Sequence, residues 1–507
     1  MSLLNRTYLY LKKNGIKQTY YTCKERLEQK RTFSYSFVPV TAEELEKQRK
    51  WYQDKQEQMQ SIKGTSKLPL ISIVVPLYCT KPEYFEEMVA SVLNQSYGNW
   101  ELVLVDASPK DRKLGAILER ISTDPRIKYA ALEDNKGISE NTNAAIELAT
   151  GDYIGLLDHD DVLTPDALFE VAQVISRVYE GEENDKSGNC NGAIGNANGP
   201  ILVYSDEDKS DEKLEHFYEP NIKPDFDLDL LLSNNYICHF SVIRADVLKS
   251  LGLRNKYDGA QDYDLMLRIA GLEDFSNIYH IPKVLYHWRC FSGSTSENPM
   301  SKLYAYDAGK EALKAYFEKR GLEVNVEHSE HLGFYKTIYK KDILKQRKEL
   351  AAVGGPIYNH RQRICAGGYD NSGKIIYENL PVQYSGYLNR AKQKQNIFLD
   401  IRNMRLADSE EVRKCARQVL GEDIDFDEAG NILLKDKFIN RLSDAKLQLS
   451  IKDVYGETYE ESNMDVSNRE MLYRALSVKL GKSLLEQGYL SCYDPETYLI
   501  ENGKRDA

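Results

Sequence analysis

The chain has 507 residues, of which 42% are hydrophobic and 29% charged, the balance of a globular protein with a large buried core. At ~150 residues per domain this length suggests two to four domains, and the composition excludes a fibrous, a disulfide-stapled or a wholly disordered chain. The formal net charge of −11 argues against a nucleic-acid-binding protein. No apolar run approaches the ~20 residues that cross a bilayer, the start of the chain lacks a secretory-signal pattern, and the eight cysteines are scattered. We therefore expect a cytoplasmic protein with reduced thiols.

The N-terminal extension, residues 1–67, is basic. It carries 14 Lys and Arg against 7 Asp and Glu, a net charge of +7, whereas the rest of the chain carries −18. Tyrosines and lysines interleave between residues 8 and 21, which leaves two interpretations open. One is a foot on an anionic membrane surface, where each basic residue adds ~1 kcal/mol; the other is a solvated helical extension that its tyrosines pack on the next domain. Residues 41–60 predict an exposed helix, with Thr41 and Glu44 as a capping box.

Beyond residue 70, strands alternate with helices. The apolar runs predict strands at 71–75, 101–106, 127–132 and 152–158, and the intervening segments predict helices at about 83–95, 111–122 and 138–149. Pro76 is expected to end the first strand. Such βαβ units predict an α/β fold with a mostly parallel sheet. Ligands bind such a sheet at the carboxyl ends of its strands, which here carry the polar segments 76–78, 106–108 and 158–161.

Three acids, Asp158, Asp160 and Asp161, stand at the end of the fourth predicted strand. Carboxylate oxygens are the ligands that Mg²⁺ and Mn²⁺ prefer, so one of Asp158 and Asp160 is a candidate metal ligand and the other a candidate ribose contact. Alternatively, the acids favour the start of the next helix through its dipole. Three neighbouring acids repel one another, which is easiest to understand if they bind a cation.

Other strand ends suggest contacts to a nucleotide. Asp106 ends the second strand, where its carboxylate can accept a hydrogen bond from a base imide. Asn135 and Lys136 follow the third strand, either as a cradle for a nucleotide or as an ordinary turn into a helix.

Two further acidic segments stand later in the chain. Asp206 and Glu207 close a predicted strand at 201–204, and Asp262 opens a helix. A helix start favours the ionised carboxylate, which suits a base that removes a proton from a hydroxyl, although such a residue can equally be a helix cap.

Taken together, these segments resemble a known family. The motifs are, in order, ISIVVPLY (71–78), VDAS (105–108), NKGISENTN (135–143), LLDHDD (156–161), YSDEDK (204–209), GAQDYDL (259–265) and YHWR (286–289). Residues of about 70–340 resemble a bacterial family 2 glycosyltransferase, in the branch of O-antigen, capsule and other cell-surface polysaccharides whose members are often called rhamnosyltransferases. The resemblance implies a GT-A fold, a nucleotide-sugar donor, a divalent metal (Mn²⁺ or Mg²⁺) and inversion at the anomeric centre.

The resemblance also assigns roles to residues. It implies that Asp158 and Asp160 match the family's DxD motif and hold the metal on the diphosphate, that Asp262 is the catalytic base, and that His287 is a third metal ligand or a phosphate contact. Gln261 stands where the family has Glu, which puts a supporting interaction in doubt. The implied donor-nucleotide contacts are Pro76, Tyr78, Asp106, Asn135, Lys136 and Asp158. The implied acceptor or donor-sugar contacts are Asp161, Asp206, Glu207, Gln261, Trp288 and Arg289.

The expected function is therefore the transfer of one sugar from a UDP- or dTDP-sugar to a lipid-linked saccharide acceptor in surface polysaccharide assembly. The Gln-x-x-Arg-Trp motif of processive polymerases is missing, which favours one sugar per encounter. Inversion by in-line attack needs one carboxylate base. For this expected function, we expect the protein in the cytoplasm or at the inner face of the cell membrane.

Two alternatives belong to other classes. A nucleotidyltransferase needs a Gly-rich, basic loop after the first strand, which this sequence lacks. A non-catalytic scaffold or binding subunit is suggested by Gln261 and by the C-terminal part, but the acids Asp158, Asp160 and Asp262 argue against it.

The remaining segments complete a prediction of three domains, at 1–67, 68–340 and 341–507. Residues 181–199, rich in Gly and Asn, predict a flexible insert. The segments VGGPIYN (353–359), ICAGGY (364–369) and LLEQGYLSCYDP (484–495) resemble the acceptor half of a second glycosyltransferase domain, without its donor half. Residues 341–507 are therefore expected to serve acceptor binding, dimerisation or partner docking rather than catalysis.

Overall fold

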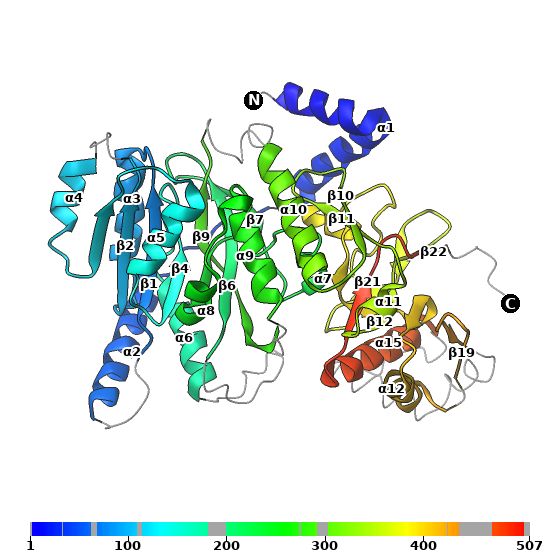
Figure 1. Cartoon of the computed structure of the whole chain (residues 1–507). Helices are drawn as coiled ribbons and strands as arrows, with labels where there is room; N and C mark the ends of the chain where they lie inside the picture. Colours follow the sequence, from blue (N-terminus) through cyan, green and yellow to red (C-terminus); the bar gives the residue numbers. More distant parts are fainter. Residues whose placement is uncertain are drawn as a thin grey trace. The chain divides into compact units, whose positions relative to one another are not determined.

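The computed structural model of the chain describes residues 3–32, 34–61, 68–108, 114–180, 199–272, 275–291, 303–422, 424–434 and 469–500 (Figure 1). The chain divides into two compact units. The first comprises residues 1–5, 31–226 and 235–316, and the second comprises residues 6–30, 227–234 and 317–507. The basic N-terminal extension thus contributes to both units. The predicted insert at 181–199 lies, except for Gly199, outside the described residues.

The first unit is built on a nine-stranded mixed sheet of spatial order β3-β2-β1-β4-β8-β6-β9-β5, with β7 paired to β6 (Figure 1). Its strands are β1 (Ile71–Leu77), β2 (Trp100–Asp106), β3 (Ile127–Ala131), β4 (Tyr153–Leu156), β5 (Val162–Leu163), β6 (Leu202–Ser210), β7 (Phe217–Asn221), β8 (Ser241–Arg244) and β9 (Ile278–Arg289). The strands from β3 to β4 are parallel, and so are β6 and β9, whereas β8 is antiparallel to both neighbours. The predicted α/β fold with its parallel βαβ units is confirmed.

Strand β1 continues through Pro76, where the sequence predicted its end. It pairs with β2 along its whole length, with Pro76 opposite Val105, but with β4 only as far as Val74 opposite Leu156. Alternate residues of a parallel strand bond to alternate neighbours. The Leu77 carbonyl bonds to the segment after β2, so the nitrogen of Pro76 faces the side where β4 has already ended. The missing N–H therefore interrupts no ladder bond.

Helices accompany these strands: α2 (Ala42–Ser61), α3 (Pro82–Leu93), α4 (Gly115–Ile121), α5 (Ile138–Leu148), α6 (Ala167–Glu180), α8 (Ala245–Leu251), α9 (Gln261–Ala270) and α10 (Leu303–Lys319). Apolar residues three and four apart on α3, among them Phe85, Met88 and Val92, are buried in the same core as Ile73 and Val75 of β1. At the start of α2 the Glu44 N–H donates to Thr41 Oγ1 (3.2 Å), as one half of the predicted capping box.

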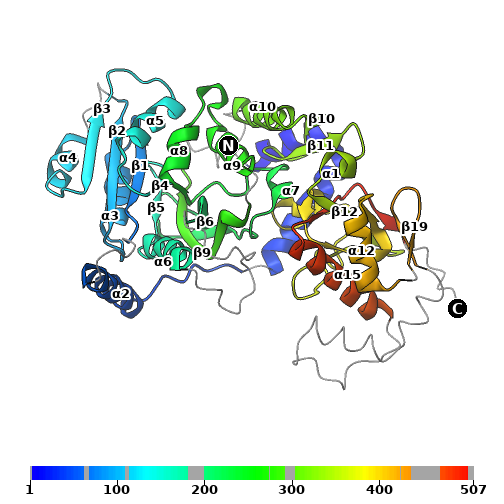
Figure 2. The same cartoon turned by 60° about the horizontal axis from the view of Figure 1, so that its bottom comes forward.

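The second unit combines most of α1 (Leu3–Thr32) with α7 (Leu228–Leu231) and the C-terminal part of the chain. Its other elements are β10 (Val324–His328), β11 (Tyr335–Tyr339), α11 (Ile343–Gln346), β12 (Leu350–Gly354), β13 (Ile357–Tyr358), β14 (Ile364–Ala366), β15 (Gly368–Tyr369), β16 (Gln395–Asn396), β17 (Phe398–Leu399), β18 (Met404–Leu406), α12 (Glu410–Leu420), β19 (Asp425–Phe426), β20 (Ile432–Leu433), α15 (Arg469–Glu486), β21 (Leu490–Tyr493) and β22 (Leu499–Ile500). Within the described part of this unit, the largest sheet has the order β16-β21-β12-β18. Helices α12 and α15 pack together around Val412, Cys415, Leu476 and Leu480 (Figure 2).

None of the helices in the described ranges combines the length and the apolar character needed to cross a membrane.

Candidate active site

The carboxyl ends of β1 and β2 adjoin in the sheet and bring three predicted nucleoside contacts together. Asp106 is the last residue of β2, and its Oδ1 accepts the Ser108 N–H (2.8 Å) while its Oδ2 accepts the Tyr129 hydroxyl (3.1 Å). Pro76 is half-buried in β1, and Tyr78 directly after β1 is exposed. The bonds to Asp106 hold its carboxylate at the strand end.

The three acids after β4 form a cluster. Asp158, Asp160 and Asp161 each offer a carboxylate oxygen, and these oxygens lie within 4.8 Å of one another. Asp161 is buried, with Oδ1 accepting the Arg289 N–H (2.7 Å) and Oδ2 accepting the Tyr286 hydroxyl (2.5 Å). The Arg289 Nε also donates to the Asp160 carbonyl (2.6 Å). Strand β9 thus fixes the loop through Asp161. The carboxylates of Asp158 and Asp160, unlike that of Asp161, make no hydrogen bonds to β9.

A histidine that the sequence analysis did not select lies beside this cluster. His239 Nε2 is 3.8 Å from Asp158 Oδ2, and its Nδ1 is 2.9 Å from Glu207 Oε2. Its ring stacks on Tyr286 with centroids 4.6 Å apart and an interplanar angle of 10°, and lies 5.8 Å from the Trp288 ring. Glu207 and Tyr286 therefore set both the position and the plane of the imidazole.

A buried lysine supports this histidine. The Lys223 side chain is fully buried, its Nζ lies 3.6 Å from Glu207 Oε2, and it donates to the carbonyls of Ile237 (2.5 Å) and His239. Burial opposes ionisation of Glu207, but Lys223 and His239 outweigh it and lower the pKa of Glu207 to about 2. The Glu207 carboxylate thus interacts with both Lys223 and His239.

The predicted base, Asp262, lies in the first turn of α9. Its Oδ2 accepts the Asn235 Nδ2–H (2.9 Å) and lies 3.6 Å from Cys238 Sγ. Gln261 accepts the Gly259 N–H through its Oε1 (2.8 Å), so that it fixes the turn before α9. Cys238 adjoins His239 in the chain, so this short segment reaches both Asp262 and the cluster after β4.

The carboxylates in this region repel one another. Loss of hydration raises the pKa of Asp158, and Asp160 and Asp262 raise it further, whereas His239 lowers it. A divalent cation relieves such repulsion, and the donor set of Asp158 and Asp160 consists of the hard oxygen atoms that Mg²⁺ and Mn²⁺ prefer. The residues present therefore fit a divalent metal.

Other predicted site residues have structural contacts. His287 is buried, with its Nδ1 2.5 Å from Asp208 Oδ1 and its ring against Phe217. Its predicted role as a metal ligand stays a prediction, and the geometry favours His239 as the histidine beside Asp158. Asp206 is buried and accepts the Lys223 backbone N–H (2.8 Å).

Two further predicted contacts differ in exposure. Arg289 is buried, and its Nη1 pairs with Glu87 Oε2 at 2.7 Å. Asn135 and Lys136 lie exposed in the turn before α5, where Asn135 Oδ1 accepts the Asn141 Nδ2–H (2.8 Å). The roles assigned to these residues stay predictions.

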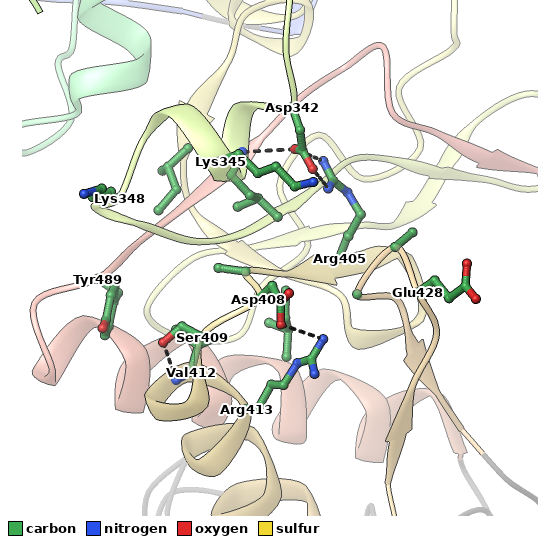
Figure 3. Close-up of a pocket in the computed structure, with 16 residues that line it drawn as sticks. Asp342, Lys345, Lys348, Arg405, Asp408, Ser409, Val412, Arg413, Glu428 and Tyr489 are labelled. Atoms are coloured by element: carbon green, nitrogen blue, oxygen red, sulfur yellow. Dashed lines mark hydrogen bonds and ion pairs between the residues drawn. The ribbon is translucent and has the colours of Figure 1, made fainter.

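The second unit has a hollow of its own, with a volume of about 680 Å³ (Figure 3). Its lining includes Asp342, Lys345, Lys348, Arg405, Asp408, Ser409, Arg413, Glu428 and Tyr489. Arg405 binds the Asp342 carboxylate through both Nη atoms (2.7 and 2.8 Å), and Arg413 Nη2 lies 3.1 Å from Asp408 Oδ1. No predicted site residue lines this hollow, and the described residues of the second unit contain no set of three side chains placed to hold a metal.

Sequence reasoning gave no role to Lys223, Asn235, Cys238 or His239. One signal is present in the sequence, a polar and aromatic run directly before β8 (NNYICHF, 234–240). Its meaning depends on pairing across the antiparallel part of the sheet, which a reading of the βαβ units did not include.

Comparison with known proteins matches residues 72–177 to Glycosyl transferase family 2. The chain is 40% identical over 253 residues to the uncharacterized protein y4gI of Sinorhizobium fredii, a match that covers 50% of this chain and 26% of that protein. It is 33% identical over 269 residues to the O-antigen biosynthesis protein RfbC of Myxococcus xanthus, covering 53% and 19%. It is 30% identical over 259 residues to the chondroitin synthase of Escherichia coli, covering 49% and 33%. The matches thus extend over about half of this chain and a third or less of each relative.

Proposed function

We propose that the chain is an inverting, metal-dependent glycosyltransferase, which the match of residues 72–177 to Glycosyl transferase family 2 supports. It moves one sugar from a UDP- or dTDP-sugar to a lipid-linked saccharide acceptor in surface polysaccharide assembly. Two of its partial relatives are named for O-antigen biosynthesis and for chondroitin synthesis, which supports a saccharide as the acceptor.

The observation that carries the proposal is that one short segment of the chain contacts both the acid cluster proposed to hold the metal and the separate carboxylate proposed as the base. Cys238 contacts Asp262, and the next residue, His239, contacts Asp158. Glycosyl transfer needs these two functions together, because the leaving diphosphate must be neutralised while the acceptor hydroxyl loses its proton.

Each group has one task in the reaction. Asp158 and Asp160 would hold the divalent cation, which when bound neutralises the leaving diphosphate as a Lewis acid. Asp262 takes the proton from the acceptor hydroxyl as its oxygen bonds to the anomeric carbon. The bond from that carbon to the phosphate oxygen breaks, and the nucleoside diphosphate leaves with the electron pair. Attack from the opposite face inverts the configuration and needs no carboxylate nucleophile.

Asn235 positions the base. Its Nδ2 donates to Asp262 Oδ2, so the proton-accepting carboxylate is held in one orientation. At the other end of the site, Ser108 and Tyr129 orient the Asp106 carboxylate, whose proposed partner is the imide of a uracil or thymine base.

Calorimetric titration of the purified full chain with UDP and with dTDP, each with and without Mn²⁺, tests the proposal. We expect binding of at least one nucleotide that Mn²⁺ strengthens and EDTA abolishes, and the preferred base narrows the donor class. The control variant is Asp246→Asn, an exposed acid paired with Arg244, which should bind as the parent does. Absence of binding by folded protein would contradict a donor site and favour a scaffold.

A further inference from the structure

Helix α1 is held to the second unit by one of its faces. Thr19, Thr22 and Glu25, spaced three apart, are buried. The Glu25 carboxylate accepts the backbone N–H groups of Ser385 (2.9 Å) and Gly386 (2.7 Å). These contacts fix which side of the helix faces its own unit.

The opposite face carries an exposed apolar stripe. Ile16, Tyr20 and Leu27 expose 80%, 61% and 60% of their surface, and Cys23 between them is also exposed. The spacing of four, three and four residues places these side chains in one row along a helix. At 100° per residue this row lies on the side away from Thr22 and Glu25, so the contacts that hold α1 to its unit leave it uncovered.

Basic side chains border the stripe. Lys17, Lys24 and Arg31 recur every seven residues along one edge, and Lys30 lies on the other; all four are exposed. Residues 3–32 contain eight Lys and Arg and two Asp and Glu, a net charge of +6 in a chain whose total is −11. An exposed apolar row between cationic edges matches an anionic lipid surface, where the row enters the acyl boundary and the ammonium groups remain among the headgroups.

We propose that this face of α1, from Ile16 to Arg31, docks on the surface of a membrane rich in anionic lipid. The tyrosine contacts expected for a packed extension coexist with this role, because Tyr10 stacks on His331 with ring centroids 5.7 Å apart. The inference is independent of the sugar transferred and of catalysis.

Sedimentation of the full chain with vesicles tests the docking surface. We expect the protein to pellet with vesicles of phosphatidylglycerol and phosphatidylcholine (1:1) and to remain in solution with phosphatidylcholine alone. The variant Ile16→Ser/Tyr20→Ser/Leu27→Ser should lower the partition coefficient on the order of 100-fold, since each buried apolar side chain contributes. The matched control is Val38→Ser, which removes an apolar side chain that is 82% exposed outside α1 and should leave sedimentation unchanged.

A second pair of variants separates charge from apolar burial. Lys17→Gln/Lys24→Gln should weaken binding roughly 30-fold and make it less sensitive to salt, at ~1 kcal/mol per basic residue near an anionic surface. Lys47→Gln/Lys50→Gln on α2 removes the same charge and should have no effect. Equal sedimentation of the stripe variant and the parent overturns the proposal. So does a parent dimer, detected by light scattering, that the stripe variant converts to monomer, because a second copy would then cover the stripe.

Discussion

A group of acids in the first unit and two acids in the second are held in different ways. In the first, Asp158, Asp160 and Asp262 have no Lys or Arg ion pair among the described residues, and loss of hydration together with the neighbouring carboxylates raises the pKa of Asp158. In the second, Asp229 is buried against Arg347 and Asp342 binds Arg405. Unpaired acids in close proximity are unfavourable unless they bind something, whereas paired charges satisfy one another. This contrast favours the acids near Asp158, rather than Asp229 and Asp342, as the place where a charged ligand would bind.

The largest effect we expect comes from removing the proposed base. Asp262→Asn keeps the size of the side chain and a hydrogen-bonding oxygen but cannot take the acceptor proton, so turnover should fall on the order of 10³-fold. Binding of UDP with Mn²⁺ should stay within about threefold of the parent, because the proposed nucleotide contacts are on β1, on β2 and after β4 rather than on α9. Turnover is measured by release of nucleoside diphosphate, with Asp246→Asn as control. Parent-like turnover would remove Asp262 from its assigned role.

A matched pair of buried cations tests the comparison directly. Lys223→Met leaves Glu207 buried without its amine, and Arg347→Met leaves Asp229 buried without its guanidinium. Each should lower the free energy of unfolding by about 3–5 kcal/mol, measured by urea denaturation.

Only the first of these changes should alter the site. Lys223 holds the carbonyls on either side of Cys238, so Lys223→Met should weaken Mn²⁺-dependent UDP binding at temperatures where it stays folded. Arg347→Met should bind as the parent does. Equal loss of binding in both variants would show that the two units are not functionally distinct.

The parallel half of the sheet was predictable because its signal is local. The apolar runs at 71–75 and 101–106 predict buried strands, which the structure has at Ile71–Leu77 and Trp100–Asp106, and in a parallel sheet their ends share one edge. The same rule selected Asp106 at the end of β2 and Asp158 and Asp160 after β4.

The rest of the site was not predictable because it depends on antiparallel pairing. Glu207 and His239 are 32 residues apart and meet only because β6 pairs with β8. Lys223 has no motif, and its role arises from burial against backbone carbonyls. Pro76 was misjudged as a strand end, since the early end of β4 cannot be read from the sequence of β1.

Removing one acid of the cluster should have a smaller effect than removing the base. Asp160→Ala deletes a proposed metal ligand whose carbonyl still binds Arg289, so the loop keeps its anchor. We expect Mn²⁺-dependent UDP binding to weaken on the order of 100-fold, about 2.7 kcal/mol, because the metal's charge on the diphosphate is worth several kcal/mol. Titration with Mn²⁺ at saturating UDP measures the change. Asp166→Ala, six residues further along and bonded to Thr164, is the control, and an equal loss in both variants would contradict a metal-ligand role.

The smallest effect that we expect comes from the protonation of His331, a histidine of the second unit. Burial, with Arg26 and Lys13 nearby, lowers the pKa of His331 to about 4. The unfolded chain, with a pKa near ~6.5, takes up this proton first as the pH falls, so the contribution of neutral His331 to stability is complete above ~6.5 and is lost as the pH falls towards 4. At pH 5 the loss amounts to about 2 kcal/mol.

His331→Phe keeps a ring against Tyr10 and cannot be protonated, so its free energy of unfolding should fall by about 2 kcal/mol less than that of the parent between pH 7.5 and pH 5. His360→Phe, an exposed histidine of the same unit, should keep the parent's response. Hydrogen exchange of the α1 amides reports the same change locally, because Tyr10 and Lys13 hold the helix to this region. If His331→Phe loses as much stability as the parent on acidification, burial and the nearby cations do not lower the pKa of His331.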